Sequence, residues 1–270
     1  MKKDYLKIRL FLFSALAVLL ILGALFSEQI CPCDPYGQDL AKALQAPNPG
    51  HLMGTDAYGR DMLSRVIAGS KVSILSTLSL VAFIAVFGTA AGVFCGYVEG
   101  LPDSVLMRIS DLCLAFPGLV FALAVAAILG GGVLNAAIAL AAISWPKYAR
   151  LARSRTLEMK GRSFIEAAFL SGDTDLQLMT RHILPNIAGP ILVTAMLDIG
   201  TMMMELAGLS FLGLGAQPPT AEWGSMMSSG RSMLQTYPWV VLSPGLAVFA
   251  TVAVFNLLGD TVRDYLDPGQ

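Results

Sequence analysis

The chain has few charges and few cysteines. Of its 270 residues, 14% are Asp, Glu, Lys or Arg, and the formal net charge is -1. A soluble domain carries about 25% charged residues, so charge is too scarce here to cover a water-exposed protein of this length. A near-neutral chain also lacks the basic field that nucleic-acid binding requires. The four cysteines exclude a disulfide scaffold.

The motifs of several enzyme classes are also absent. There is no G-x-x-x-x-G-K-[ST] and no Gly-Lys dipeptide, so the chain has no phosphate-binding loop. If ATP drives this protein, another chain hydrolyses it. The chain has two histidines, His51 and His182, which lie in separate segments and so cannot form a two-histidine zinc site. No G-x-S-x-G nucleophile motif occurs. We therefore expect no catalytic residue and no cofactor in this chain.

Long uncharged stretches are the main positive feature. Charged residues are missing from residues 10–26, 72–98, 112–146 and 232–259. A membrane crossing needs about 20 apolar residues in a helix, because each adds ~1.5 Å across ~30 Å of hydrocarbon. The stretches therefore predict an all-α polytopic membrane protein.

Six transmembrane helices are expected. The run 112–146 is long enough for two crossings, which the triple glycine 130–132 would separate by a turn. Glycines at 88, 92 and 96 predict close helix packing. The first helix has no small-residue cleavage site after it and is expected to be a retained anchor. The expected helices cover residues 8–26, 72–97, 104–129, 133–148, 187–212 and 239–258.

The distribution of Lys and Arg predicts the orientation. With six crossings both termini lie on one side, which holds thirteen of the 18 basic residues. The positive-inside rule places that side, including a loop at about 149–186, in the cytoplasm. Two segments, about 27–71 and 213–238, lie outside. We divide the chain into an N-terminal anchor with its extracytoplasmic segment (1–71) and a membrane domain (72–270).

The cytoplasmic loop has the pattern of a helical hairpin. Ser163 and Glu166 have capping-box spacing, and Gly172 favours a left-handed stop. Residues 173–175 can cap a second helix that ends before Pro185. A hairpin packed on its own bundle is one interpretation. Its apolar side chains also suit a membrane surface or a socket on another protein.

The loop resembles the EAA loop of ABC-transporter importer permeases. The matching residues are Glu166-Ala167-Ala168, Gly172 and His182-Ile183-Leu184-Pro185. The family usually has Ile at the position of His182, whereas its peptide and nickel branch commonly has His. The resemblance implies that the helix docks into a cleft on the ATPase subunit. It implies an ATPase-coupling role for Glu166, Ala167, Ala168, Gly172, His182 and Pro185.

Two other stretches resemble the C-type permease subunit of the dipeptide, oligopeptide and nickel importers. They are Gly54–Asp61 with Ser64-Arg65, and Leu209–Gly215 with Pro219 and Glu222–Gly224. Their expected roles are turns, caps and packing. The resemblance implies a second permease subunit, two ATPase subunits that bind ATP and Mg, and an extracytoplasmic substrate-binding protein. It implies a bacterial inner membrane location, surrounded by lipid, with both termini cytoplasmic.

A polar stripe on the fifth predicted helix is the candidate translocation path. Asp198 and Glu205 are seven residues apart, so they share a helix face with Met202 and Thr201 near them. Ionisable groups inside a membrane usually face a cavity or a partner. In the alternative interpretation, Asp198 or Glu205 bonds a neighbouring helix or subunit and never meets substrate.

Nickel, free or chelated, is the expected cargo. The sequences around Leu197–Gly200, Met202-Met203 and Pro219–Gly224 resemble the nickel branch more than the peptide branch. Asp198 is the candidate metal ligand, since a carboxylate attracts Ni²⁺. A dipeptide or oligopeptide cargo is the alternative. A more distant one is a secondary transporter or membrane scaffold outside the ABC class. Cys31 and Cys33 provide only two ligands, an incomplete metal site.

Overall fold

The computed structural model describes residues 2–266, and all regular elements in that range are helical. Two isolated bridges, Asn48 with His51 and Thr55 with Asp61, form no strand there. The all-α prediction is confirmed. The elements are α1 (Lys2–Leu25), α2 (Ser27–Ile30), η1 (Leu40–Lys42), α3 (Met62–Val98), α4 (Gly100–Ala115), α5 (Gly118–Ile128), α6 (Val133–Lys160), α7 (Ser163–Leu170), α8 (Asp175–Gln177), η2 (Leu178–Ile183), α9 (Leu184–Phe211), α10 (Trp223–Gly230), η3 (Arg231–Met233) and α11 (Trp239–Leu266).

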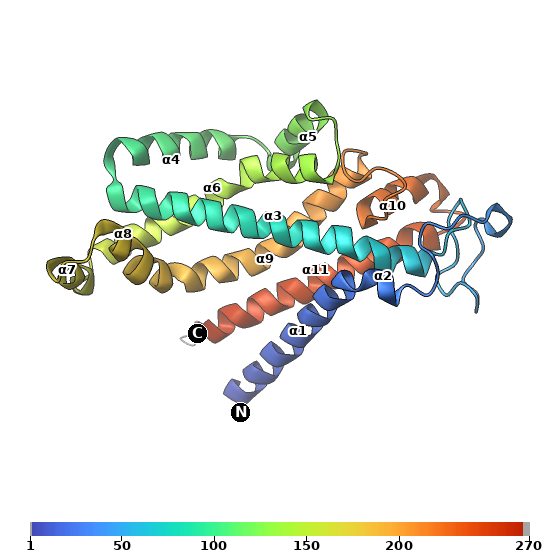
Figure 1. Cartoon of the computed structure of the whole chain (residues 1–270), viewed down its shortest axis with the longest axis horizontal. Helices are drawn as coiled ribbons and strands as arrows, with labels where there is room; N and C mark the ends of the chain where they lie inside the picture. The colour runs from blue at the N-terminus through green and yellow to red at the C-terminus, as the bar shows by residue number, and fades with distance from the viewer. Residues whose placement is uncertain (1, 267–270) are drawn as a thin grey trace.

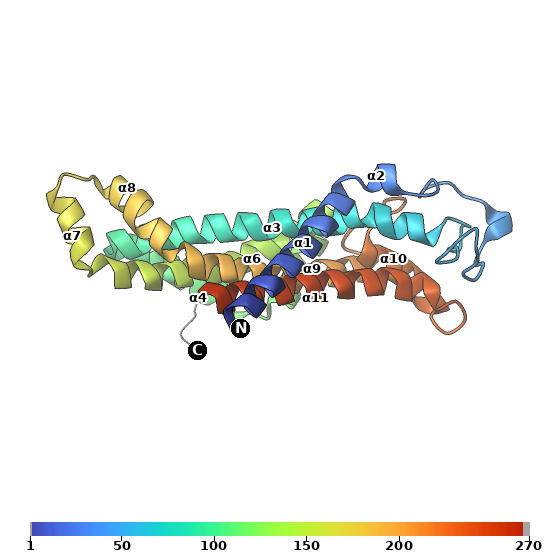
Figure 2. The same ribbon diagram turned by 90° about the horizontal axis from the view of Figure 1, so that it is seen from below.

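Helices α3, α6, α9 and α11 run roughly along the long axis of the molecule, and α1 packs on α11 and α3 (Figures 1 and 2). The backbones of α3 and α6 approach closely through the predicted glycine ladder. A Cβ on Gly92 would lie 2.2 Å from the Ala149 carbonyl oxygen, and one on Gly88 would lie 2.5 Å from that of Trp145. Only a residue without a side chain permits this separation.

The third predicted helix is two helices. α4 ends at Ala115, α5 begins at Gly118, and the two are bent by 94°. Pro117 is the N-cap of α5, and Phe116 before it is extended, because a residue that precedes proline disfavours helical geometry. The single helix 104–129 was therefore wrong. The predicted turn at 130–132 is confirmed, since all three glycines have positive φ.

Several helices extend beyond their predicted bounds, and α1 begins at Lys2 instead of 8. α3 begins at Met62 instead of 72, α6 continues to Lys160 instead of 148, and α11 continues to Leu266 instead of 258. The sequence-based boundaries followed the uncharged runs. A helix can extend past such a run, because Lys, Arg, Glu and Met are good helix formers.

Length and composition identify fewer crossings than predicted. Among the described residues, four helices can span a membrane, namely α1 from Tyr5, α3, the continuous helix from Asp175 to Phe211, and α11. The bent pair α4–α5 makes a fifth. α6, the remaining member of the predicted six, carries Lys147 and Arg150 in the middle of its sequence. The structure therefore gives four or five spans by these criteria.

The segment between α6 and α9 is a helical hairpin, as predicted, with a different cap. The N-cap of α7 is Arg162, which makes no side-chain cap, so the box of Ser163 and Glu166 does not form. Thr174, one of the residues 173–175 predicted to cap the second helix, caps α8 and forms a capping box with Gln177. Gly172 ends α7 with φ +97°.

The second arm of the hairpin does not stop before Pro185. α8 continues through the π-helical turn η2 directly into α9, and Pro185 lies in the first turn of α9. In an α-helix the proline ring would clash with the carbonyl four residues earlier. The wider π turn relieves this clash, so the predicted break is absent.

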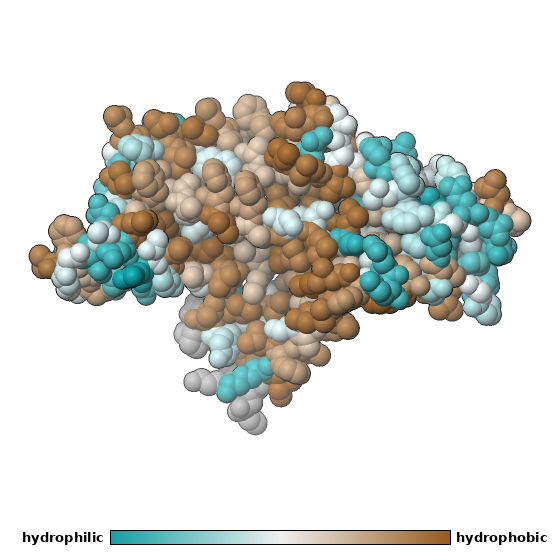
Figure 3. Space-filling view, viewed as in Figure 1, coloured by the Kyte–Doolittle hydropathy of each residue, from teal (hydrophilic) through white to brown (hydrophobic). Residues whose placement is uncertain are grey.

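The surface has an apolar middle, one strongly polar end, and an opposite end where polar and apolar residues are mixed (Figure 3). Large apolar side chains are exposed along the middle, among them Phe11, Val86, Ile128 and Phe249. Such a belt suits a protein surrounded by lipid. We call the end with α7 and α8 the hairpin end, and the end with residues 31–61 and 212–238 the loop end. The start of α1 and the end of α11 lie side by side and point away from the loop end (Figures 1 and 2).

Candidate functional site

The hairpin end presents an apolar cap to its surroundings. Phe169, Leu170 and Leu176 are exposed, and Leu170 reaches 85% exposure. Glu166 and Ala167 are also exposed on α7, whereas Ala168 is half-buried against the core. The EAA residues therefore lie on an accessible surface that is both apolar and acidic.

Local hydrogen bonds set the shape of the hairpin turn. The backbone N–H of Gly172 donates to the Phe169 oxygen at 3.0 Å, and Nε2 of His182 lies 2.8 Å from Oδ2 of Asp173. The Thr174 hydroxyl accepts from the Gln177 N–H. His182 thus pairs with the turn of its own hairpin. Pro185 is exposed at the start of α9.

The four residues of the predicted stripe lie along one edge of α9. Asp198 and Met202 are buried, Glu205 is half-buried and Thr201 is exposed. At 3.6 residues per turn, the four residues occupy one sector of the α9 surface. Thr201 and Met202 lie at the two edges of this sector, and the two carboxylates lie between them. The stripe therefore runs along the boundary between the buried and the accessible faces of α9.

Asp198 has a specific partner. Nζ of Lys147 on α6 donates to its Oδ1, and the Asp198 side chain is 4% exposed against 54% for Lys147. A buried carboxylate bound to an ammonium group is already neutralised, and it offers little to a cation. Within residues 2–266, no group of three or more His, Cys, Asp or Glu side chains is arranged to hold a metal ion. The residues around Asp198 do not fit a metal site.

Three basic residues on α6 form a row of ion pairs that sequence reasoning missed. Besides Lys147 with Asp198, Arg150 pairs with Asp111 and Arg153 pairs with Asp103, both on α4. The basic residues are three positions apart and so share a face of α6. That spacing was a visible signal, but their acidic partners lie 39 to 51 residues away. The sequence analysis assigned these basic residues to the cytoplasmic side from the positive-inside rule and predicted no partners for them.

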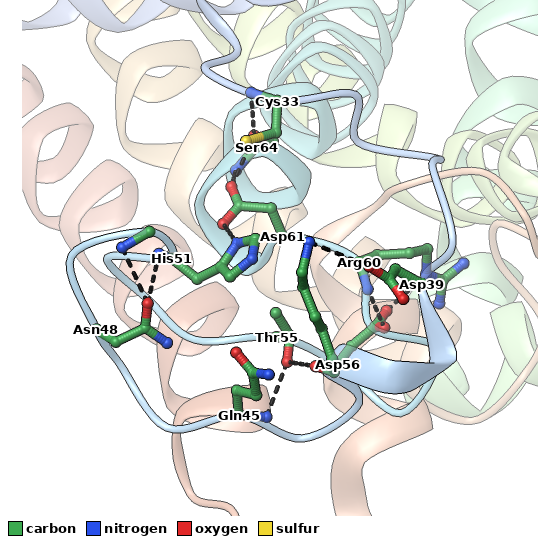
Figure 4. A network of polar contacts seen from close by, with 12 residues as sticks. Cys33, Asp39, Gln45, Asn48, His51, Thr55, Asp56, Arg60, Asp61 and Ser64 are labelled. Carbon is green, nitrogen blue, oxygen red and sulfur yellow. Dashed lines mark hydrogen bonds and ion pairs between the residues drawn. The ribbon is translucent and has the colours of Figure 1, made fainter.

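The loop end contains a buried network of charges (Figure 4). Nε of Arg60 donates to Oδ2 of Asp56 at 2.6 Å, and Nε of Arg65 lies 3.6 Å from the same oxygen. The backbone N–H groups of Tyr58 and Arg60 donate to the other oxygen of Asp56. Arg65 also donates to the Pro35 carbonyl at 3.0 Å. The carboxylate of Asp56 therefore binds Tyr58, Arg60 and Arg65, and Arg65 connects this group to Pro35.

Asp61 has a similar role at the start of α3 (Figure 4). It caps the helix by accepting from the Ser64 N–H at 2.8 Å, and it accepts from the Ser64 hydroxyl at 2.7 Å. Its other oxygen lies 3.0 Å from Nδ1 of His51. Trp239 on α11 donates to the Thr55 carbonyl at 3.1 Å, which fixes the segment to the helices.

Glu222 and Trp223 have structural roles at the start of α10. Glu222 caps α10 by accepting from the N–H groups of Gly224 and Ser225. The indole N–H of Trp223 donates to the Val66 carbonyl at 2.8 Å, which joins α10 to α3. Turns, caps and packing were the expected roles of these residues.

Cys31 and Cys33 are free thiols at the loop end. The Cys31 thiol donates to the Ser64 carbonyl at 3.3 Å, and the Cys33 N–H donates to the Ser64 hydroxyl at 3.1 Å. Burial raises the pKa of the Cys31 thiol. Both residues therefore anchor the chain after α2 to the first turn of α3.

Comparison with protein families gives one match over most of the chain. Residues 88–270 match the model of the binding-protein-dependent transport system inner membrane component. The matched region contains the hairpin, the α9 stripe and the row of ion pairs on α6.

Curated relatives match nearly the whole chain. The glutathione transport system permease protein GsiD of Escherichia coli O6:K15:H31 (strain 536) is 44% identical over 252 residues, which cover 93% of this chain and 83% of the relative. The proteins of the same name from Shigella boydii serotype 4 and Escherichia coli O157:H7 match equally well.

A solved structure supports the fold. The crystal structure of an amino acid ABC transporter with histidines aligns with a TM-score of 0.51 at 20% identity. The alignment covers 74% of this chain and 94% of the other. At this identity the likeness concerns the arrangement of helices alone.

Proposed function

The chain belongs to the family of binding-protein-dependent transport system inner membrane components, and from that premise we propose that its cargo is a small peptide. It is a permease subunit of an ABC importer; the ATPase is a separate subunit. The observation that carries the cargo proposal is the 44% identity to glutathione permeases over 93% of the chain. Glutathione is a tripeptide, so the peptide alternative replaces nickel as the preferred cargo. The pairing of Asp198 with Lys147 supports this choice, because no cluster of donors for Ni²⁺ is then left among the residues that the structure describes.

The translocation path runs along the α9 stripe. Asp198, Thr201, Met202 and Glu205 combine charge, a hydroxyl and a polarisable thioether at the boundary of the buried face. Peptides carry ammonium, carboxylate and amide groups, so a path with both Lys147 and carboxylates offers partners to each. The second permease subunit completes the path on the accessible side of α9.

The hairpin end contacts the ATPase subunits, which bind ATP and Mg. Glu166, Ala167, Ala168 and Gly172 lie on or beside the exposed helix α7, and His182 and Pro185 hold the second arm. Exposed apolar side chains at this end support a protein partner. The hairpin and both termini then lie in the cytoplasm. The loop end faces the extracytoplasmic binding protein.

α6 is the sixth crossing in this proposal. Its cations would be costly in lipid if they were unpaired. Lys147, Arg150 and Arg153 each have a carboxylate partner on a neighbouring helix, which lowers that cost.

Uptake by the reconstituted complex tests the cargo. Proteoliposomes that contain this chain, its partner permease and the ATPases are supplied with the binding protein and either labelled glutathione or ⁶³Ni²⁺. We expect ATP-dependent uptake of the peptide. Nickel uptake without peptide uptake would reverse the proposal. Gradient-driven uptake by this chain alone would place it among secondary transporters.

A substitution tests the path. Asp198→Asn removes the charge that Lys147 neutralises and keeps the size of the side chain. We expect peptide uptake to fall about tenfold, a change that corresponds to about 1.4 kcal/mol. Glu28→Gln is the control, because Glu28 on α2 is exposed and pairs with Lys71 on α3. Equal uptake by the two variants would remove Asp198 from the path.

A further inference from the structure

We propose that four residues at the base of the hairpin transmit its movement to the turn between α3 and α4. They are Tyr97, Glu99, Lys160 and Asp175, and we call them the hairpin-base junction. The proposal rests on the proposed contact between the hairpin and the ATPase, and it names the residues through which that contact acts on the membrane helices.

The junction joins both arms of the hairpin to one end of α3. The Tyr97 hydroxyl donates to Oδ1 of Asp175 at 2.6 Å. Nζ of Lys160 donates to the Tyr97 carbonyl at 2.8 Å and to Oε1 of Glu99 at 2.7 Å. The same Nζ lies 5.4 Å from the centre of the Tyr97 ring. Lys160 is the last residue of α6 and Asp175 is the first of α8, so the chain enters and leaves the hairpin beside Tyr97.

Glu99 connects the junction to the α3–α4 turn. Its φ is +58°, and that of Gly100 is +71°. A residue with a side chain adopts a left-handed conformation only where its surroundings hold it. The ammonium group of Lys160 holds the Glu99 carboxylate. Displacement of Lys160 therefore releases a constraint on the turn that directs α4.

α4 then moves with α6 as one body. Arg150 pairs with Asp111 and Arg153 pairs with Asp103, so two ion pairs attach α4 to α6 beyond the turn. α4 leads in turn to the 94° bend before α5. A movement at the hairpin base thus reaches α4 and α5 through bonded contacts.

The first arm of the hairpin borders an open pocket and buries little of its own surface. A cavity of about 360 Å³ lies at the base of α7, and it is lined by Tyr97, Lys160, Ile165, Glu166, Phe169, Leu170 and Leu178. Ile165 is the one side chain of α7 that is buried. α7 packs against α6 and η2, whereas the bond between Asp175 and Tyr97 links α8 to α3. The junction is therefore a bonded connection between a loosely packed hairpin and the α3–α4 turn.

Transport stoichiometry tests the junction. In the reconstituted complex with its binding protein, we measure peptide imported per ATP hydrolysed. Tyr97→Phe removes one hydroxyl and should lower this ratio about fivefold, within the range of the net contribution of one ordinary hydrogen bond, while ATP hydrolysis persists. Asp175→Ala should have the same effect, and the double variant should add nothing. Asp175→Asn keeps an acceptor oxygen and should retain most of the ratio.

Two controls separate transmission from stability. Tyr265→Phe changes an exposed tyrosine near the end of α11 and should leave the ratio unaltered. Lys160→Met should lower the ratio, whereas Lys160→Arg keeps a donor for Glu99 and should lower it less. A purely structural role would reduce the amount of assembled complex without changing the ratio for the complex that remains, and this result would overturn the proposal.

The outcomes also distinguish this proposal from the proposed function. If Tyr97→Phe and Lys160→Met import as much peptide per ATP as Tyr265→Phe, the transmission role is overturned and the importer assignment stands. If the unaltered complex imports neither peptide nor any other cargo with ATP, both proposals are overturned.

Discussion

The two ends of the molecule differ in which side chains they bury and which they expose. At the loop end, charged side chains are buried and bonded to one another, and Asp56, Arg60 and Arg65 are each less than a tenth exposed. At the hairpin end, apolar side chains such as Phe169 and Leu170 are exposed, and the pair of His182 with Asp173 in the turn is only partly buried. The hairpin end has an apolar surface that suits a partner.

This difference follows from what each end does in the proposed importer. A binding protein associates and leaves, so its docking surface must be stable alone. An ATPase subunit that stays bound can cover apolar side chains permanently, and such surfaces resemble a protein core cut in half. The comparison makes a series of predictions about the energetics of the two ends.

The largest expected effect is the loss of Asp56 at the loop end. Asp56→Ala leaves Arg60 and Arg65 buried without their partner, which should cost about 3–5 kcal/mol of unfolding free energy. Asp173→Ala removes the partner of His182 at the hairpin end, where both side chains are about 30% exposed. That change should cost about 1 kcal/mol or less. Thermal unfolding of the purified chain in detergent measures both, and equal costs would contradict the comparison.

The next effect concerns the hairpin turn. Gly172 has φ +97° with no heavy atom within 4 Å of a Cβ built on it, so Gly172→Ala is strained only by the backbone, by about 1–2 kcal/mol. Gly161→Ala is the matched control, because Gly161 also has open space but a φ of −81°. We expect the first variant alone to uncouple ATP hydrolysis from import. Normal coupling in Gly172→Ala would show that the turn geometry is dispensable.

The next prediction concerns Leu170, whose substitution should weaken ATPase binding with little change in the unfolding free energy of the chain. Leu170→Ser should alter the unfolding free energy by less than about 0.5 kcal/mol, because the side chain is exposed in the isolated chain. It should nevertheless weaken ATPase binding, since a leucine buried at an interface contributes about 2 kcal/mol. Leu40→Ser at the loop end, where Leu40 is also highly exposed, should leave ATPase binding unchanged. Co-purification with the ATPase subunits measures both.

The smallest perturbation is chemical labelling, which tests on which side of the membrane each end of the molecule lies. Cys33 is exposed, whereas Cys31 is partly buried with a raised thiol pKa, so an impermeant maleimide on intact cells should label Cys33 faster. In a Cys33→Ser background, Leu170→Cys should react only after the cells are permeabilised. Labelling of that cysteine from outside would invert the proposed topology.

Some local features were predictable from the residues alone. Gly172 and the glycines at 130–132 all have the positive φ that their sequence context indicated. Gly88 and Gly92 allow the predicted close packing, now assigned to α6. These features were predictable because glycine has a local conformational preference and because helical periodicity is regular.

Other features depended on contacts that are distant in the sequence. The carboxylate of Asp198 suggested a path or a metal ligand, but its partner Lys147 lies 51 residues earlier. The capping box predicted from the spacing of Ser163 and Glu166 does not form, whereas Thr174, within the predicted caps of the second helix, does cap it. Spacing identifies residues that can interact, and it does not show whether they do.

The sequence by itself determined that this chain is an all-helical membrane protein with a helical hairpin near residues 163–183, because uncharged runs and short motifs act through local geometry and transfer to lipid. Only the tertiary structure decided which charges are paired, where Pro117 divides a predicted helix, and how Tyr97 and Lys160 attach the hairpin to α3. Ion pairs and hydrogen bonds between distant residues depend on how whole helices pack, and no local pattern encodes that arrangement.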